Sequence, residues 1–276
     1  MADQDAKKTR EPLVDGLFYP DEAGALEAAL DAYESECGQP RGRALAIVSP
    51  HAAYEKSGPL QAAAFLAAAD RKIRRAVLVG PVHRDFVDAI ILPGSEIFTV
   101  PSGSFGVEEK SVESLLSCGT HFIRSDIPHL EEHCLEVQLP FLGRYFPGVK
   151  IVPILLGKDS AANIKTLGKG LYLTFEKELS STLFIITTNF CESRKSEKAI
   201  AEADEIIGLA EKKDGQALME RKLSRHLTAC GVGCLAAFFL GFPGAGGVKL
   251  LGRAFSVSDA EADKRVEYAA LAIGAS

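Results

Sequence analysis

The chain has 276 residues, of which 47% are hydrophobic and 25% are charged, and its formal net charge is −6. This length and composition are typical of a soluble globular protein that can bury a large core. The acidic balance excludes a basic surface for nucleic acid, and we expect neither a nucleic-acid partner nor a membrane. The polar N-terminus lacks the apolar core of a signal peptide, so we expect a cytoplasmic protein whose six cysteines are mostly free thiols.

Predicted helices and apolar strands alternate along most of the chain. The sequence predicts helices over 21–37, 57–69, 107–117, 131–146 with a bend at Pro140, 160–178, 194–212, 214–225, and from about 230. It predicts strands over 44–48, 75–80, 88–92, 149–157, 181–189, and two closing runs at 248–257 and 265–275. Strands without polar alternation are typical of parallel sheets that are covered on both faces. We therefore expect an α/β fold, a single three-layer domain over 1–276 with a mostly parallel central sheet flanked by helices, and with residues 1–10 flexible.

Polar side chains follow three of the apolar strands. His51 comes after the strand at 44–48, His83 follows the strand at 75–80, and Asn189 lies at the end of the strand at 181–189. Open α/β sheets bind ligands outside the carboxyl ends of their strands. If these strands are parallel neighbours, the polar residues converge on one crevice.

Cys230 lies at the start of a predicted buried helix, where a thiol more readily becomes the thiolate that binds metals. Two imidazoles and one anionic ligand form the kind of set that holds mononuclear non-haem iron. The alternatives are ordinary loop histidines and a cysteine that packs in the core. We expect His129 to be solvated, and by its spacing alone His133 is structural.

Several motifs follow one another in the order found in a known family. They are "GLFYP", "SPHAAYEKSG", "VLVGPVHRDF", "HCLEVQLPF", "VPILLG", "TTNFCES", "CGVGCLAAF" and "VEYAALAIG". Over residues 11–274 the chain resembles the Memo family, which includes the bacterial AmmeMemoRadiSam system protein B.

This resemblance implies a fold similar to that of the class III (LigB-type) extradiol dioxygenases. It implies that His51, His83 and Cys230 are metal ligands, and it gives His133 a place in the site as an acid/base group. It also implies iron as Fe²⁺, or copper; zinc is a further alternative that the His/His/Cys set itself allows. Members of the family are associated with a radical-SAM protein, which is therefore an expected partner.

One segment departs from the family pattern. Where the family commonly has Asp-Phe-x-His, this chain has Asn189, Phe190, Cys191 and Glu192. An Asp→Asn change removes a general base but keeps a hydrogen-bonding group beside the ligands. We expect Glu192 to replace the missing carboxylate as a catalytic group, with Asn189 and Tyr54 lining the cofactor pocket; the alternative is a site that no longer does chemistry.

Three functions are compatible with these residues. The first is a metal-dependent oxidoreductase, similar to a dioxygenase, that acts on a small molecule. The second is a non-enzymatic binding or signalling module that recruits a small-molecule or peptide ligand. The third is a zinc-dependent hydrolase, although the sequence has no HExxH motif. Whether the chain is an enzyme stays open at this stage, and the bound metal would discriminate among the three.

Overall fold

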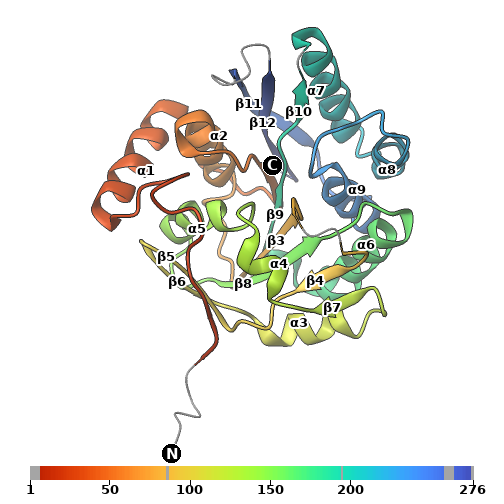
Figure 1. Ribbon diagram of the computed structural model, residues 1–276, viewed down its shortest axis with the longest axis horizontal. Coiled ribbons are helices and arrows are strands. Elements are labelled where there is room, and N and C mark those ends of the chain that lie inside the picture. Colours follow the sequence, from red (N-terminus) through yellow and green to blue (C-terminus); the bar gives the residue numbers. More distant parts are fainter. Residues whose placement is uncertain (1–6, 85–86, 194, 258–263, 275–276) are drawn as a thin grey trace, which may run out of the picture.

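The structure is a computed structural model that describes residues 7–84, 87–193, 195–257 and 264–274 (Figure 1). Its strands are β1 (Thr9–Arg10), β2 (Ala46–Ser49), β3 (Arg75–Pro81), β4 (Ile90–Leu92), β5 (Ile97–Val100), β6 (Gly103–Gly106), β7 (Phe122–Arg124), β8 (Lys150–Leu156), β9 (Thr182–Thr187), β10 (Cys191–Ser193), β11 (Val248–Val257) and β12 (Arg265–Ile273). Its α-helices are α1 (Ala23–Cys37), α2 (Tyr54–Leu66), α3 (Glu109–Leu116), α4 (Ile127–Glu131), α5 (Leu139–Tyr145), α6 (Ala161–Phe175), α7 (Ser196–Glu211), α8 (Gly215–Leu223) and α9 (Val232–Gly241). Two 3-10 helices, η1 (Glu136–Gln138) and η2 (Glu176–Ser181), precede α5 and follow α6.

The central sheet has the strand order β10-β12-β2-β9-β3-β8-β4-β7, and β11 pairs with β12. Its middle strands β2, β9, β3 and β8 are parallel, whereas β12 pairs antiparallel with β2, and β4 pairs antiparallel with β8. The middle strands are almost continuously apolar because both of their faces are covered. The predicted α/β class with a parallel sheet centre is therefore confirmed.

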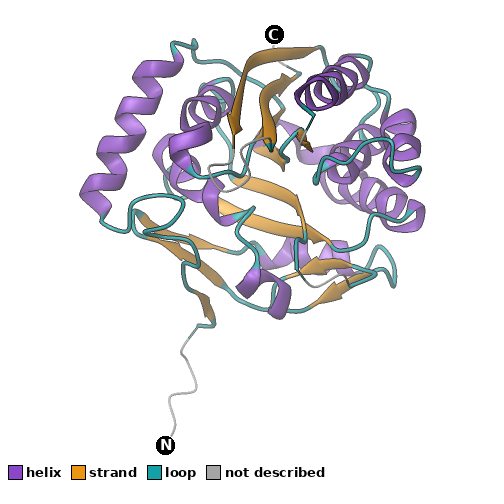
Figure 2. Cartoon of the chain, turned by 45° about the horizontal axis from the view of Figure 1, so that its top comes forward, coloured by secondary structure: helices purple, strands orange, loops and turns teal. Residues whose placement is uncertain are grey.

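Helices cover both faces of this sheet, which gives three layers (Figures 1 and 2). On β2, Ile47 packs against the side that α1, α2 and α5 cover, whereas Val48 packs against the side covered by α3, α6, α7, α8 and α9. This alternation along a strand places each apolar residue in one of two cores. Among the described residues, no helix combines the length and the apolar character that crossing a bilayer requires.

The predicted helix over 131–146 is wrong. The chain leaves α4 at Glu132, whose φ of −108° and ψ of 128° are extended, and it becomes helical again only at η1 and α5. Pro140 does not bend a helix but lies in the first turn of α5, where a proline costs no intrahelical hydrogen bond. The break matters because Glu132 and His133 lie in it.

The N-terminal residues contribute a second, small sheet that the sequence did not predict. Its strand order is β1-β5-β6, and β1 pairs parallel with β5. Of the residues expected to be flexible, 1–6 lie outside the described residues, whereas Arg10 in β1 is only 1% exposed.

His129 in α4 corrects another expectation, since it is 1% exposed rather than solvated. Its Nε2 lies 3.2 Å from the main-chain oxygen of Ile91, and its ring packs edge-on against Phe98. Burial lowers the pKa of His129 from 6.5 to about 4. The imidazole is therefore neutral in the folded protein at neutral pH.

We expect this buried imidazole to make the fold sensitive to acid. Between pH 6.5 and about 4 the unfolded chain binds a proton on His129 that the folded chain does not, so stability falls as the pH falls through this window. From about pH 7 to about pH 5, the wild type should lose about 2 kcal/mol more unfolding free energy than His129→Leu. Urea unfolding at both pH values measures this difference. Packing changes in the variant alter the unfolding free energy equally at the two pH values, so they cancel in the comparison. Equal losses in the two proteins would contradict the prediction.

Candidate metal centre

The carboxyl ends of the parallel middle strands meet at one edge of the sheet. His51 lies two residues after the end of β2, His83 lies two residues after the end of β3, and Thr187 is the last residue of β9. The sequence interpretation assumed that the two histidine-bearing strands are neighbours. In the structure β9 lies between them. Thr187 is thus brought between the two histidines.

Three imidazoles gather at this edge. The ring centroids of His51 and His83 are 5.1 Å apart, and His133 lies 5.7 Å from His51 and 5.1 Å from His83. One potential ligand nitrogen from each ring lies within 4.8 Å of the others. His133 reaches the cluster because the chain is extended between α4 and η1.

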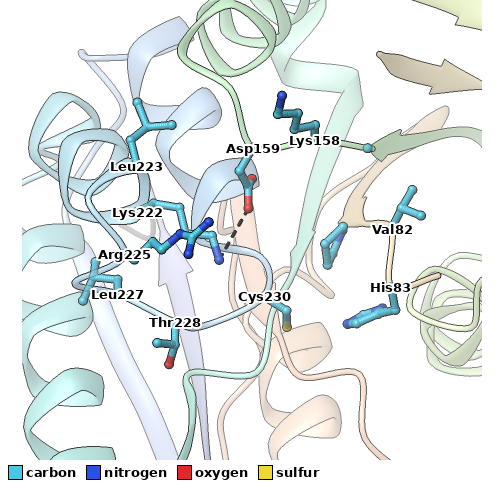
Figure 3. Close-up of a pocket in the computed structure, with 12 residues that line it drawn as sticks. Val82, His83, Lys158, Asp159, Lys222, Leu223, Arg225, Leu227, Thr228 and Cys230 are labelled. Atoms are coloured by element: carbon cyan, nitrogen blue, oxygen red, sulfur yellow. Dashed lines mark ion pairs between the residues drawn. The ribbon is translucent and has the colours of Figure 1, made fainter. Parts of the chain in front are cut away.

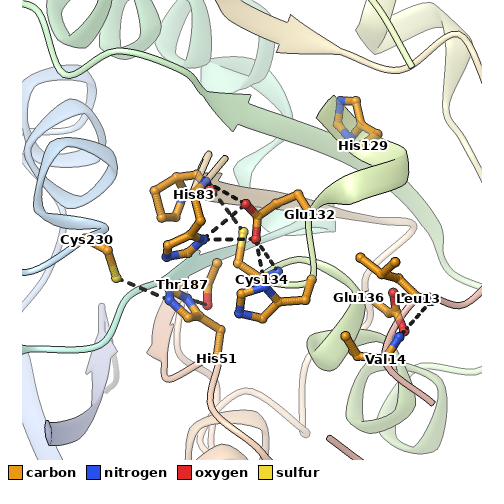
Figure 4. A network of polar contacts seen from close by, with 12 residues as sticks. Leu13, Val14, His51, His83, His129, Glu132, Cys134, Glu136, Thr187 and Cys230 are labelled. Atoms are coloured by element: carbon orange, nitrogen blue, oxygen red, sulfur yellow. Dashed lines mark hydrogen bonds and ion pairs between the residues drawn. The ribbon is translucent and has the colours of Figure 1, made fainter. Parts of the chain in front are cut away.

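His51 is held from two sides. Its Nδ1 lies 2.8 Å from Thr187 Oγ1, and its Nε2 lies 3.2 Å from Cys230 Sγ (Figure 4). Its main-chain N–H donates to Asn189 Oδ1 at 3.2 Å, and the Asn189 N–H donates to Cys230 Sγ at 3.4 Å. Asn189 therefore supports both His51 and Cys230.

Glu132 connects the other two histidines. Its buried carboxylate lies 3.0 Å from His83 Nδ1 and 3.2 Å from His133 Nδ1. It also accepts hydrogen bonds from the main-chain N–H groups of His83 at 2.8 Å and Cys134 at 2.9 Å (Figure 4). One carboxylate thus orients both rings through their Nδ1 atoms, as in carboxylate–histidine–metal arrangements.

Glu132, His83 and Cys230 stabilise one another's charged forms. Burial would raise the pKa of Glu132, but the hydrogen bond from His83 and the charges of both histidines lower it to about 2. For His83, burial lowers the pKa, yet contacts with Cys230 and Glu132 outweigh it and raise the pKa to about 10. The Cys230 thiol has its pKa raised by burial, but His51 and His83 bring it well below its usual range. His133 has a pKa of about 4, mainly because of burial. The lowered pKa of Cys230 favours the thiolate, the form that binds metals.

The loop that carries Cys230 is fixed by a buried carboxylate. Glu202 of α7 accepts hydrogen bonds from the N–H groups of Thr228 and Ala229, and from the Thr228 hydroxyl at 3.0 Å. A Cβ at Gly231 would lie 2.3 Å from the main-chain oxygen of Thr187, so only glycine allows the loop to approach β9 this closely. The Cys230 sulfur is thereby held beside His51.

The structure brings some of the predicted site residues together and leaves others apart. The ones that meet are His51, His83, His133, Cys230 and Asn189. Tyr54 is buried in the core, where its hydroxyl donates to the main-chain oxygen of Val137 at 2.8 Å. Glu192 is exposed on β10 and pairs with Lys264 at 2.8 Å, so it makes no contact with the histidines among the described residues.

Sequence reasoning missed three supporting residues, namely Glu132, Thr187 and Glu202. The run of acids around His133 was the only signal for Glu132. Nothing in the sequence distinguished Glu202 from the other acids of α7.

The donor set fits a transition metal. Imidazole nitrogens suit iron, copper and zinc, and a thiolate favours copper and zinc. Each histidine has an orienting partner on its Nδ1, either Thr187 or Glu132, which is what ligating histidines usually show. The residues that could hold an ion are His51, His83 and His133, with Cys230 adjacent.

Fold and site together define an α/β protein with a histidine cluster at the carboxyl edge of its parallel strands. The family model for Memo-like proteins matches residues 10–272, so the chain belongs to the Memo family. This confirms the resemblance seen in the motifs.

Similar proteins agree with this assignment. A "MEMO1 family protein" from Thermotoga maritima is 30% identical, covering 82% of this chain and 86% of its own length. A second, from Pyrobaculum arsenaticum, is 28% identical and covers 96% and 98%. Among solved structures, an uncharacterized protein from Escherichia coli K12 matches with a TM-score of 0.51 at 10% identity, covering 82% of this chain and 98% of its own. That likeness concerns the fold alone.

Proposed function

We propose that the chain binds one redox-active metal ion, iron or copper, and acts as a metal-dependent oxidoreductase on a small molecule. The observation that carries the proposal is the group of ligand atoms from His51, His83 and His133 within 4.8 Å of one another. Cys230, whose sulfur lies 3.2 Å from His51 Nε2, is the fourth donor. When bound, such an ion supplies Lewis acidity and electron transfer at the edge of the sheet.

The chain's own residues orient and shield the donors. Glu132 fixes the rings of His83 and His133, and Thr187 fixes that of His51. Gln138 supports Thr187 with a hydrogen bond of 3.3 Å from its Nε2. A cavity of about 610 Å³ lies against His83 and Cys230, and it gives a small molecule access to the donors.

Metal analysis of protein purified without oxygen tests the proposal. We expect near-stoichiometric iron or copper in the wild type and a strong loss in His51→Ala, His83→Ala, His133→Ala and Cys230→Ser. His226→Ala is the matched control, because His226 is exposed and pairs with Glu205. Zinc alone would favour the hydrolase. A wild type that takes up no ion after incubation with Fe(II), Cu(I) and Zn(II) would overturn the proposal and favour a binding module.

A further inference from the structure

The cavity beside the histidine cluster has three walls (Figure 3). The segment after β3 contributes Val82 and His83, and the loop after β8 contributes Lys158 and Asp159. The third wall is the segment that runs from the end of α8 to Cys230. His83 and Cys230 line the cavity, so a molecule bound there lies next to the proposed metal ligands.

The permanent charges of this lining are mostly positive. The lining contains one carboxylate, that of Asp159, and three cationic side chains, those of Lys158, Lys222 and Arg225. Lys222 Nζ lies 3.4 Å from Asp159 Oδ2 and donates to the main-chain oxygen of Ala229 at 2.8 Å. Asp159 thus balances one of the three cations. Lys158 is exposed and lies 3.6 Å from Asp88, a contact that solvent weakens.

Arg225 is the cation of this lining that has no ion pair with any described carboxylate. No carboxylate in the described part of the chain lies within ion-pair distance of its guanidinium, whereas Arg221, four residues earlier, pairs with Glu205 at 3.2 Å. The turn after α8 gives Arg225 a φ of 58° and is closed by its N–H, which donates to the Lys222 oxygen at 3.0 Å. This turn fixes the main chain of Arg225, and its side chain is an exposed part of the cavity lining.

We propose that this cavity is an anion subsite, which binds a carboxylate or phosphate group of the small molecule that reacts at the neighbouring centre. Arginine presents paired N–H donors that match both oxyanions, and Lys222 and Lys158 add positive charge around them. The volume of about 610 Å³ is that of a small-molecule site. The role in the reaction rests on the proposed metal function, but the binding of the anion itself does not need the metal.

Calorimetric titration of the full chain with inorganic phosphate and with succinate tests the subsite, first on chelator-treated, metal-free protein. We expect at least one probe to bind the wild type, with an affinity that falls as salt rises. Arg225→Asn removes the charge and suits the left-handed backbone, and it should weaken binding about tenfold or more. Arg225→Lys should lose less, and Lys158→Gln on the opposite wall should also weaken binding.

Arg221→Gln is the matched control, because it removes a nearby arginine that does not line the cavity. Preference for phosphate or for succinate identifies which anion the substrate carries, and either supports the subsite. The subsite would be refuted if Arg225→Asn bound the anion with wild-type affinity. It would also be refuted if anion binding required the metal and did not depend on Arg225. Metal content is measured on the same samples, so a protein that binds the anion but no metal refutes the proposed function and leaves the subsite standing.

Discussion

Replacing Glu136 by glutamine should lower the free energy of unfolding by about 3–5 kcal/mol, because it leaves a buried guanidinium without its counter-charge. The side chains of Arg10 and Glu136 form an ion pair in which they are 1% and 0% exposed. Arg10 also donates to the main-chain oxygens of His129 and Glu132, which keeps it from turning toward water. Urea unfolding followed by circular dichroism at neutral pH measures the effect.

The same carboxylate anchors the N-terminal segment, which adds to the expected loss. Glu136 accepts hydrogen bonds from the N–H groups of Leu13 at 2.9 Å and Val14 at 3.0 Å (Figure 4). It also accepts from the Tyr19 hydroxyl at 2.6 Å. As a control, Glu27→Gln removes an exposed partner of Arg144 and should change the stability by less than about 1 kcal/mol. If Glu136→Gln behaved like this control, the importance of the buried pair would be refuted.

Glu132→Gln should weaken metal binding by about 10- to 100-fold while the protein stays folded. The reason is that Glu132 fixes both His83 and His133 through their Nδ1 atoms, at 3.0 and 3.2 Å. In the glutamine variant one of the two carboxylate oxygens becomes an NH₂ donor, which would face a main-chain N–H of His83 or Cys134, and the negative charge beside the two rings is lost. Competition for the metal with a chelator of known affinity gives the ratio of dissociation constants.

Glu131→Gln is the matched control for this experiment, since the neighbouring Glu131 is exposed in α4. It should keep wild-type metal affinity. Urea midpoints recorded for both variants separate a change in the site from a loss of the fold. Unchanged affinity in Glu132→Gln would mean that the two histidines are oriented without it.

The positions of His51 and His83 could be predicted because strand ends are visible in the sequence. Uninterrupted apolar runs define the middle strands, and a parallel arrangement brings the residues after them to one edge. Cys230 could be proposed as a neighbour of these histidines because it lies at the start of a predicted helix. These predictions depend only on local pattern and on a general property of parallel sheets.

The contribution of Glu132 could not be predicted in this way. The sequence shows an acidic run that includes Glu131, Glu132 and Glu136, and the run itself does not indicate which carboxylate contacts a histidine. Only the extended backbone at Glu132 turns its carboxylate toward the histidines, and tertiary contacts determine that break. Burial of His129 was missed for a similar reason, because the sequence does not reveal what packs over α4.

The insertion of β9 between β2 and β3 determines when the site can form during synthesis of the chain. Without β9, the strands that carry His51 and His83 would be separated by an empty position, about 10 Å across. The centre therefore forms only after residue 187, and its sulfur donor follows at Cys230. A ribosome-bound fragment that ends earlier cannot offer these donors together, so the proposed metal would load only after Cys230 has been synthesised. If the centre binds an ion as proposed, the binding energy would stabilise the native state as a whole.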